Sequence, residues 1–305
     1  FVSVIIPVFN DQQRLMLCLK ALDRQTYPRE YFEVIVIDNG SRDEIIRDPE
    51  LLNGFRYFKE TTPGSGAARN AGILQARGEI IAFTDSDCIP APGWIEKGVE
   101  SLLNGNNDMV GGRIDYHFGG SGKLSAAQLY DHVIYLDQER HVKRYHFFAT
   151  ANLFVKRKLF DACGFFDARL KYASDVEWTQ RAFFSGFRQG YADQVVVSHE
   201  AKARLTQILK RAWKAMESAR FLKRDETDPR SFFACVPLSR RTGWLIDDSL
   251  YALQTRKLDR LTQRIKVVAV IFLCGIVRII LSVKCWMTDR FSGQNHKQVV
   301  AAGGL

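Results

Sequence analysis

Short apolar runs alternate with amphipathic stretches through the first third of the chain. The runs are typical of strands buried on both faces, and they predict strands at 2–8, 33–37, 55–58 and 80–83. Apolar residues at helical spacing predict helices between the runs, at 12–25, 67–76 and 94–103. This alternation indicates an α/β fold, with a mostly parallel sheet covered by helices on both faces.

The alternation loosens after Gly112. Further along, the pattern predicts a helix at 124–139, strands at 147–155 and 194–198, and a helix at 175–185. From Leu205 the chain becomes helical and basic. We therefore divide it into two halves of one domain, 1–115 and 116–204, and a helical C-terminal region, 205–305.

One run in the C-terminal region, 267–283, is almost wholly apolar. Its length is at the lower limit for spanning a bilayer, and Arg278 within it argues against a simple span. Lys266 on one side, with Lys284 and Trp286 on the other, suits a segment embedded in a membrane interface. A core helix or an oligomer helix would show the same pattern.

The net charge of +9 is concentrated at the C-terminal end. Residues 199–305 hold 20 Lys and Arg against 9 Asp and Glu, whereas the remainder holds 23 against 25. Anionic lipid, a phosphorylated acceptor or a solvated helical surface would each explain this bias. A nucleic-acid partner is not expected, because the basic residues do not interleave with stacking aromatic residues.

The six cysteines are scattered without any C-x-x-C spacing, which disfavours a zinc site or a disulfide framework. We expect reduced thiols in a cytosolic protein. The chain starts with Phe1 inside a strand-like run, without Met or a signal peptide, and we expect that it begins at a domain edge or was trimmed.

The strongest chemical signal is Asp85-Ser86-Asp87, directly after the strand predicted at 80–83. Ligands bind such sheets at the carboxyl ends of strands. A hard cation held by one or two carboxylates keeps positions open for the oxygens of a diphosphate. A turn with solvated carboxylates would look the same in isolation.

Four segments now stand in order along the chain: Val4–Asn10, Val36–Ser41, Gly66–Gly72 and Asp85–Asp87. Together they resemble the family-2 glycosyltransferases, which are inverting enzymes that use nucleotide-diphosphate sugars. The resemblance covers roughly residues 1–215 and implies a GT-A fold, with a Rossmann-like sheet. It makes 1–115 the nucleotide-sugar-binding half and 116–204 the acceptor-binding and catalytic half. The basic region 205–305 would then associate with a membrane.

The resemblance implies a donor site built from five of these residues. Pro7 would lie against the nucleobase, and Asp38 and Asn39 would contact the base or the ribose. Many relatives carry a second Asp where this chain has Asn39. Gly66 and Arg69 would bind an anionic group near a helix start. Read alone, Asp38-Asn39-Gly40 is also an ordinary turn.

The resemblance also implies a metal site. Asp87 would bind the ion directly, Asp85 would contact it through water or hold the ribose, and His199 would complete it. An imidazole nitrogen favours Mn²⁺ over Mg²⁺. Lys210 and Arg211, on the helix that follows, would approach the diphosphate or an anionic acceptor.

Asp175 matches the position of the family's catalytic base. Relatives usually have Glu where this chain has Ser174, and Glu177 ranks second as a candidate. The base must remove the proton of the acceptor hydroxyl as the bond to the sugar forms. From the residues alone, Asp175 and Glu177 could equally be an acidic first turn of a helix.

We therefore expect an inverting, metal-dependent glycosyltransferase with UDP as the carrier. The acceptor would be a glycan or a lipid-linked glycan at the cytoplasmic face of a membrane, and one or a few sugars would be added. Two alternatives stay open: a sugar nucleotidyltransferase that releases pyrophosphate, and a non-catalytic nucleotide-sugar-binding module.

Overall fold

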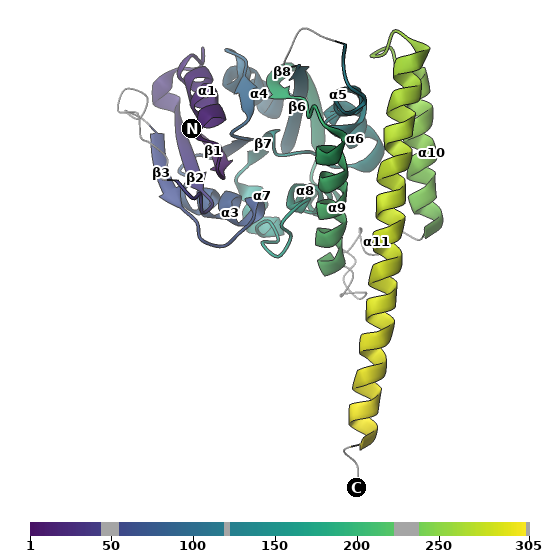
Figure 1. The fold of residues 1–305 in the computed structure, drawn as a ribbon. Helices are drawn as coiled ribbons and strands as arrows, with labels where there is room; N and C mark the ends of the chain where they lie inside the picture. The colour runs from purple at the N-terminus through teal and green to yellow at the C-terminus, as the bar shows by residue number, and fades with distance from the viewer. Residues whose placement is uncertain (44–54, 119–122, 223–237, 303–305) are drawn as a thin grey trace.

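A computed structural model of the chain describes residues 1–43, 55–118, 123–222 and 238–302. Its strands join in one sheet, in the order β3-β2-β1-β4-β7-β6-β8-β5 (Figure 1). The strands are β1 (Val2–Val8), β2 (Phe32–Asp38), β3 (Phe55–Lys59), β4 (Ile80–Thr84), β5 (Cys88–Pro90), β6 (Met109–His117), β7 (Asn152–Lys156) and β8 (Gln189–Glu200).

Helices cover both faces of the sheet and form a separate group at the C-terminal end (Figure 1). The helices of the body are α1 (Gln12–Asp23), η1 (Arg29–Tyr31), α3 (Ser65–Gln75), α4 (Trp94–Asn104), α5 (Ala126–Tyr130), η2 (Asp131–Tyr135), α6 (Gln138–Tyr145), α7 (Lys158–Cys163) and α8 (Ser174–Phe184). The C-terminal helices are α9 (Leu205–Leu222), α10 (Leu238–Gln254) and α11 (Leu261–Ala302).

The prediction of a mostly parallel sheet is confirmed. Among the described strands, β3, β2, β1 and β4 run parallel to one another, and β6 runs parallel to β8. β7 is antiparallel to β4 and β6, and β5 is antiparallel to β8. Side chains of α1 and α4, such as Leu15 and Trp94, pack on one face, and those of α3 and α8, such as Ile73 and Trp178, pack on the other. The carboxyl ends of β1, β2 and β4 therefore meet at one edge.

Three predicted elements were wrong in extent. The strand expected at 194–198 is longer, since β8 spans Gln189–Glu200. The strand expected at 147–155 begins only at Asn152, because the backbone before it is held by side chains instead of a neighbouring strand: Ala149 N donates to Gln138 Oε1 and Thr150 N to Asp175 Oδ2. The helix expected at 124–139 is divided into α5, η2 and α6. Asp137 caps the start of α6, where its side chain accepts from Arg140 N.

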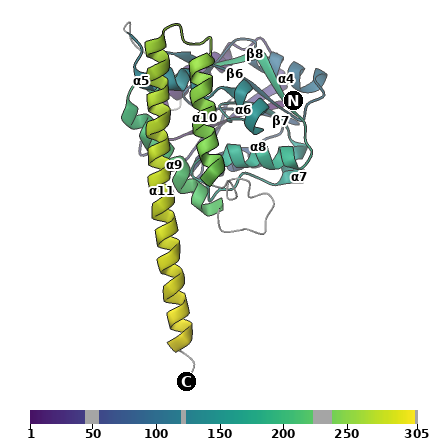
Figure 2. The same ribbon diagram turned by 90° about the vertical axis from the view of Figure 1, so that its right-hand side faces the viewer.

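The C-terminal helices pack beside the body, and α11 continues well beyond it (Figures 1 and 2). One face of α11, with Val267, Ile271 and Cys274, is buried against α5, α9 and α10. Across the described residues, no helix combines the length and apolarity needed to cross a membrane. The side chains of Lys284 and Trp286 lie outside those that the structure describes.

The described cysteines are free thiols. Cys18, Cys88 and Cys274 are buried, and Cys163 is half-buried. Cys235 and the side chain of Cys285 lie outside the described part of the chain.

Candidate active site

The turns that follow β1 and β2 are bonded to each other at the edge of the sheet. Asn10, with φ of 51°, donates its backbone N–H to Ser41 Oγ, and its side-chain oxygen accepts from Arg42 N. Pro7 pairs in register with Ile37 at the end of this parallel pair. The two turns thus form one wall of the site, beside Pro7.

Asp38 ends β2 with a carboxylate that is already hydrogen-bonded. Oδ2 accepts from the Tyr57 hydroxyl at 2.8 Å, and Oδ1 accepts from Ser41 N at 3.0 Å. Burial raises the pKa of Asp38, but these hydrogen bonds outweigh burial and lower it below its ordinary value. The carboxylate is thereby kept ionised and fixed in direction.

Asn39 holds three segments together. Its Nδ2 donates to the carbonyls of Glu60 and Thr62, and its Oδ1 accepts from Gly64 N at 2.7 Å. An aspartate at this position could accept from Gly64 but could not donate to the two carbonyls. The amide therefore positions the loop that leads into α3.

Gly66, in the first turn of α3, lies against the start of α8. A Cβ on Gly66 would stand 2.9 Å from Ser174 Oγ, and Ser174 is buried. Ala173, just before it, has φ of 61°, a left-handed conformation that costs energy for a residue with a side chain. Small residues at 66 and 174 thus let the two helix starts approach, next to Asp175.

Arg69 lies on α3 with its guanidinium against Asp85. Its Nη2 donates to Asp85 Oδ1 at 2.7 Å, and the Arg69 side chain is buried. Burial raises the pKa of Asp85, and the nearby Asp87 and Asp175 carboxylates raise it further, against the opposing effect of Arg69. The predicted anion-binding cation therefore neutralises one member of the carboxylate pair.

Asp87 lies beside His199, as the resemblance implied. His199 Nε2 is 3.4 Å from Asp87 Oδ2. Lys202 Nζ and Arg14 Nη1 are 3.6 and 3.8 Å from the same oxygen. Burial raises the pKa of Asp87, but His199, Lys202 and Arg14 together lower it well below its ordinary range. Asp87 is therefore an anion at any physiological pH.

The pair Asp87 and His199 suits a divalent cation. Two ligand atoms at about 2.1 Å from one ion are about 3 Å apart when they lie at right angles, close to the distance between these atoms. Across the described residues, no three His, Cys, Asp or Glu side chains are placed to bind one metal ion together. Protein groups alone would therefore not complete the coordination shell of the cation. Diphosphate oxygens and water are the usual additional ligands of such a site.

Asp175 lies in the first turn of α8, half-buried. Its Oδ2 accepts from Thr150 N at 3.2 Å and from Thr150 Oγ1 at 3.3 Å, and its Oδ1 accepts from Val176 N. Thr150 comes two residues before Asn152, which pairs in register with Thr84, so Asp175 lies near the end of β4 that carries the carboxylate pair. Both oxygens are oriented by the protein.

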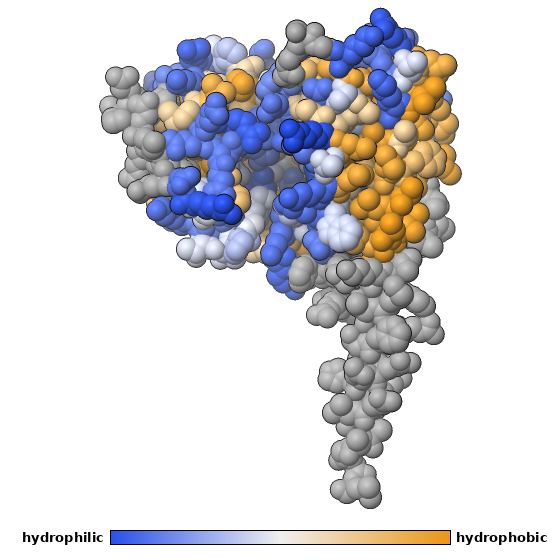
Figure 3. All heavy atoms as spheres, viewed as in Figure 1, coloured by the Kyte–Doolittle hydropathy of each residue, from blue (hydrophilic) through white to orange (hydrophobic). Residues whose placement is uncertain are grey.

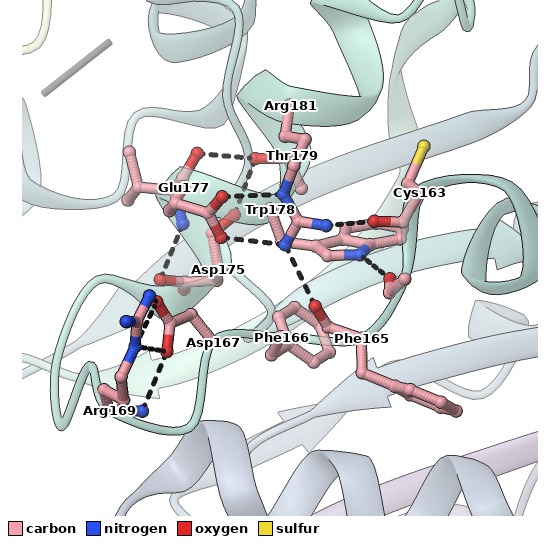
Figure 4. A network of polar contacts seen from close by, with 12 residues as sticks. Cys163, Phe165, Phe166, Asp167, Arg169, Asp175, Glu177, Trp178, Thr179 and Arg181 are labelled. Atoms are coloured by element: carbon pink, nitrogen blue, oxygen red, sulfur yellow. Dashed lines mark hydrogen bonds and ion pairs between the residues drawn. The ribbon is translucent and has the colours of Figure 1, made fainter. Parts of the chain in front are cut away.

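Glu177 has a different environment. Figure 4 shows its carboxylate held by Arg181, with Nε at 2.7 Å from Oε1 and Nη2 at 3.0 Å from Oε2. Arg181 also donates to the carbonyls of Cys163 and Phe165. Glu177 thus belongs to a buried ion pair that fastens α8 to the segment after α7, whereas Asp175 points away from that ion pair.

Asn152 is wholly buried, and its side chain bonds only to protein groups. Nδ2 donates to the carbonyls of Arg113 and Val195, and Oδ1 accepts from Trp94 Nε1. From the sequence alone, Asn152 could equally hydrogen-bond a sugar hydroxyl or satisfy strand backbone, and the observed contacts correspond to the second role.

Lys210 and Arg211 point in different directions on α9. Lys210 is exposed. Arg211 is directed inward, where it forms an ion pair with the buried Asp131 and lies over the ring of Tyr135, 3.1 Å from the centroid. Asp131 also accepts from Lys202 N, so this ion pair positions the segment that brings Lys202 to Asp87.

Three residues that contact the predicted site carboxylates were missed in the sequence: Arg14, Tyr57 and Lys202. Each contacts a predicted site carboxylate through the fold, and no motif marks it. Only the placement of Lys202, three residues after His199, could have suggested its role.

The fold is similar to solved transferases of the GT-A class. The mannosyltransferase PcManGT from Pyrobaculum calidifontis, in complex with GDP-Man and Mn²⁺, superposes with a TM-score of 0.60 at 20% identity, over 93% of this chain and 86% of that one. S. aureus TarS 1–349, in complex with UDP, gives a TM-score of 0.53 at 18% identity, over 91% and 90%. These likenesses establish the fold class.

Sequence comparison gives the family. The model of glycosyl transferase family 2 matches residues 3–176, more than half of the chain. Glycosyltransferase AglE of Haloferax volcanii is 37% identical over 207 residues, 66% of this chain and 67% of that protein. The chain spans only 29% of a second relative, the uncharacterized glycosyltransferase YfnE of Bacillus subtilis. The chain belongs to glycosyl transferase family 2.

Proposed function

We propose that the protein is an inverting, metal-dependent glycosyltransferase that moves a hexosyl group from a nucleotide diphosphate, UDP, to a hydroxyl group of its acceptor. The observation that carries the proposal is that the loop after β4, with Asp85 and Asp87, lies beside His199 of β8 and near Asp175 of α8. Similar folds hold GDP-Man with Mn²⁺ and UDP in their complexes, which supports a nucleotide-sugar donor.

The donor would lie along the edge from Asp38 to Asp87. Pro7, Asp38 and Asn39 form the base and ribose end, and Gly66 and Arg69 lie near the first carboxylate. A divalent cation such as Mn²⁺, or Mg²⁺, held by Asp87 and His199 would neutralise the leaving diphosphate. Lys202 and Arg14 are placed to add positive charge there.

Asp175 would act as the general base. Its carboxylate is held by Thr150 and Val176, so it needs little rearrangement to face an acceptor hydroxyl. An alcohol is a far weaker acid than a carboxylic acid, so the proton moves late, once the oxygen has bonded to the sugar. Attack from the side opposite the diphosphate inverts the anomeric centre.

We further propose a glycan or lipid-linked acceptor at a membrane surface, on the cytoplasmic side. The basic residues of 205–305 support this, among them the exposed Lys210, which would approach an anionic acceptor or the diphosphate. The free thiols among the described cysteines are in keeping with a reducing compartment.

The test is product analysis with UDP-glucose, UDP-N-acetylglucosamine and GDP-mannose, with water or a membrane lipid extract as acceptor. The proposal predicts release of the nucleoside diphosphate by wild type and a loss of at least a thousandfold in Asp175→Asn. Asp161→Asn, the same change on an exposed part of α7, should keep full activity. Pyrophosphate as a product would identify a nucleotidyltransferase, and donor binding without turnover would identify a binding module.

A further inference from the structure

The C-terminal helices carry an exposed apolar surface. Figure 3 shows hydrophobic side chains gathered over α10 and α11. The residues that define this surface, which we call the α10–α11 face, are 48–61% exposed: Ile246, Leu250, Ile265, Phe272, Ile276 and Ile279. Contiguous apolar surface of this kind marks an interaction site more often than chance exposure.

Helical geometry makes the face continuous. Ile265, Phe272, Ile276 and Ile279 recur at spacings that place them along one side of α11. The opposite side of α11 is also apolar and packs on the protein. Internal packing explains one face of the helix and leaves the other without a partner among the described residues.

Charge around the face favours an anionic surface. Residues 260–281 contain no Asp or Glu. The turn between the two helices exposes Arg256 and Arg260 together with one carboxylate, Asp259, and Lys266 is exposed near the start of α11, so this end of the face is basic. An apolar helix face bordered by basic residues is the pattern of helices that lie in a membrane interface.

A second copy of the chain is the main competitor, because the α11 spacing also fits a coiled-coil seam. Such a seam is usually flanked by charged residues of both signs. Here Leu273 and Ile280, which flank it, are exposed and apolar, at 38% and 55%. A parallel pair of copies would also bring the two basic turns, which have like charge, to the same end of the interface. Both features favour lipid.

We propose that the α10–α11 face docks on an anionic lipid surface, with the two helix axes parallel to the bilayer and the basic turn among the headgroups. The inner side of α11 stays on α5 and α9, so only the outer side enters the lipid. This deepens the proposed function by giving the surface that approaches a membrane-bound acceptor. Lys202, which lies near Asp87, comes three residues before the start of α9, and α9 packs against α11. Docking of α11 on lipid would therefore keep the donor site close to the membrane surface.

The test is vesicle flotation of the full chain, with phosphatidylcholine alone or with 30% phosphatidylglycerol. Wild type should float with the anionic vesicles. The triple variant Ile265→Gln/Phe272→Gln/Ile276→Gln should lose at least tenfold in partition coefficient. The variant Arg256→Gln/Arg260→Gln/Lys266→Gln should lose binding to the anionic vesicles, by about fivefold for each charge, and approach the neutral-vesicle level.

A matched control, Leu17→Gln/Leu103→Gln, removes exposed apolar residues from α1 and α4 and should float like wild type. Circular dichroism melting reports whether each variant is folded, without reference to donor binding or turnover. Unchanged flotation of the folded apolar triple variant would overturn the proposal. A wild type that ignores both vesicles and is a dimer in sedimentation, with a monomeric triple variant, would overturn it in favour of a second copy. Either result leaves donor turnover as a separate test of the proposed function.

Discussion

The Nε2 atom of His199 lies 3.4 Å from Oδ2 of Asp87, and the pairing of β5 with β8 places them there. Cys88, the residue after Asp87, is the register partner of His199. The three-residue strand β5 therefore connects the carboxylate after β4 to the imidazole near the end of β8. A change that shifts this register would separate the two groups without touching either.

Asp85→Asn should destabilise the fold as well as weaken donor binding. The amide would leave the buried guanidinium of Arg69 without its charged partner. Because Asp85 is about one third exposed, water reduces the cost, and we expect a loss of about 2 kcal/mol in the free energy of unfolding. Urea unfolding measures it, with Asp161→Asn as the control. A loss below about 0.5 kcal/mol would contradict the importance of the pair.

Asp175→Asn should remove turnover while donor affinity stays within about threefold of wild type. The amide can still accept from Thr150 but cannot take up the acceptor proton. Thr150→Val, which removes only the hydroxyl contact, should lower kcat by a smaller factor. Steady-state kinetics with calorimetry of the donor separates the two effects. Full activity in Asp175→Asn would assign the base elsewhere.

Glu177→Gln should have the opposite profile. It breaks the ion pair with Arg181 on a nearly buried carboxylate, and we expect a loss of about 3 kcal/mol in the free energy of unfolding. At temperatures where the variant is folded, kcat should stay within a few-fold of wild type. A thousandfold loss of kcat in a folded Glu177→Gln would show that the second-ranked carboxylate is the base.

Asn152→Ala should be among the most destabilising changes outside the donor site. It leaves the carbonyls of Arg113 and Val195, and the indole N–H of Trp94, without partners in the core. Each unpaired buried group costs about 1–3 kcal/mol, so a total of about 4 kcal/mol is expected. Chemical unfolding measures it against Asn104→Ala, at the exposed end of α4. Wild-type stability with altered sugar preference would instead place Asn152 in the sugar site.

Stability should fall in mild acid because of His141. The ring is buried, stacked on Phe147 with centroids 4.6 Å apart, and burial lowers its pKa to about 4 even though Asp137 opposes this. The unfolded chain takes up this proton below about pH 6.5, and the folded protein only near pH 4. The free energy of unfolding should therefore fall by up to about 3 kcal/mol between these pH values.

Denaturant unfolding at stepped pH checks this, with His141→Gln as the variant and His117→Gln, on an exposed strand end, as the control. The His141 variant should show a smaller slope than wild type between pH 6.5 and 4. Some slope should remain, because burial also lowers the pKa of His132, and the control should keep the wild-type slope. An unchanged slope in His141→Gln would assign the acid sensitivity to other groups.

The first half of the fold could be read from the sequence because its strands are continuous apolar runs. The ends of β1, β2 and β4, which carry Pro7, Asp38 and Asp85, were found within a residue or two. The edge strand β5 has only three residues, too short for any periodic signal, and β6 contains Gly111 and Gly112 where a strand pattern would need side chains. Without those strands, the approach of His199 to Asp87 could not be derived from spacing and came only from the family resemblance.

Side-chain partners were harder to predict than positions. Arg69 and Arg211 were both expected to meet an anionic ligand, since a cation near a helix or a loop gives no sign of its partner. The structure pairs them with Asp85 and Asp131, carboxylates that are distant in sequence. Asn39 likewise resembled a turn residue, and its bonds to Glu60, Thr62 and Gly64 depend on a loop that the sequence does not define.

The most direct test of the metal-dependent donor site is calorimetry of UDP, GDP and dTDP binding, with and without Mn²⁺, on wild type, Asp87→Asn and Asp161→Asn. We predict that UDP binds wild type and Asp161→Asn tightly only with Mn²⁺, and that Asp87→Asn loses this dependence. Metal-independent binding that is equal in all three proteins, or no binding of any nucleotide, would contradict the assignment of Asp87 and His199 as the metal site.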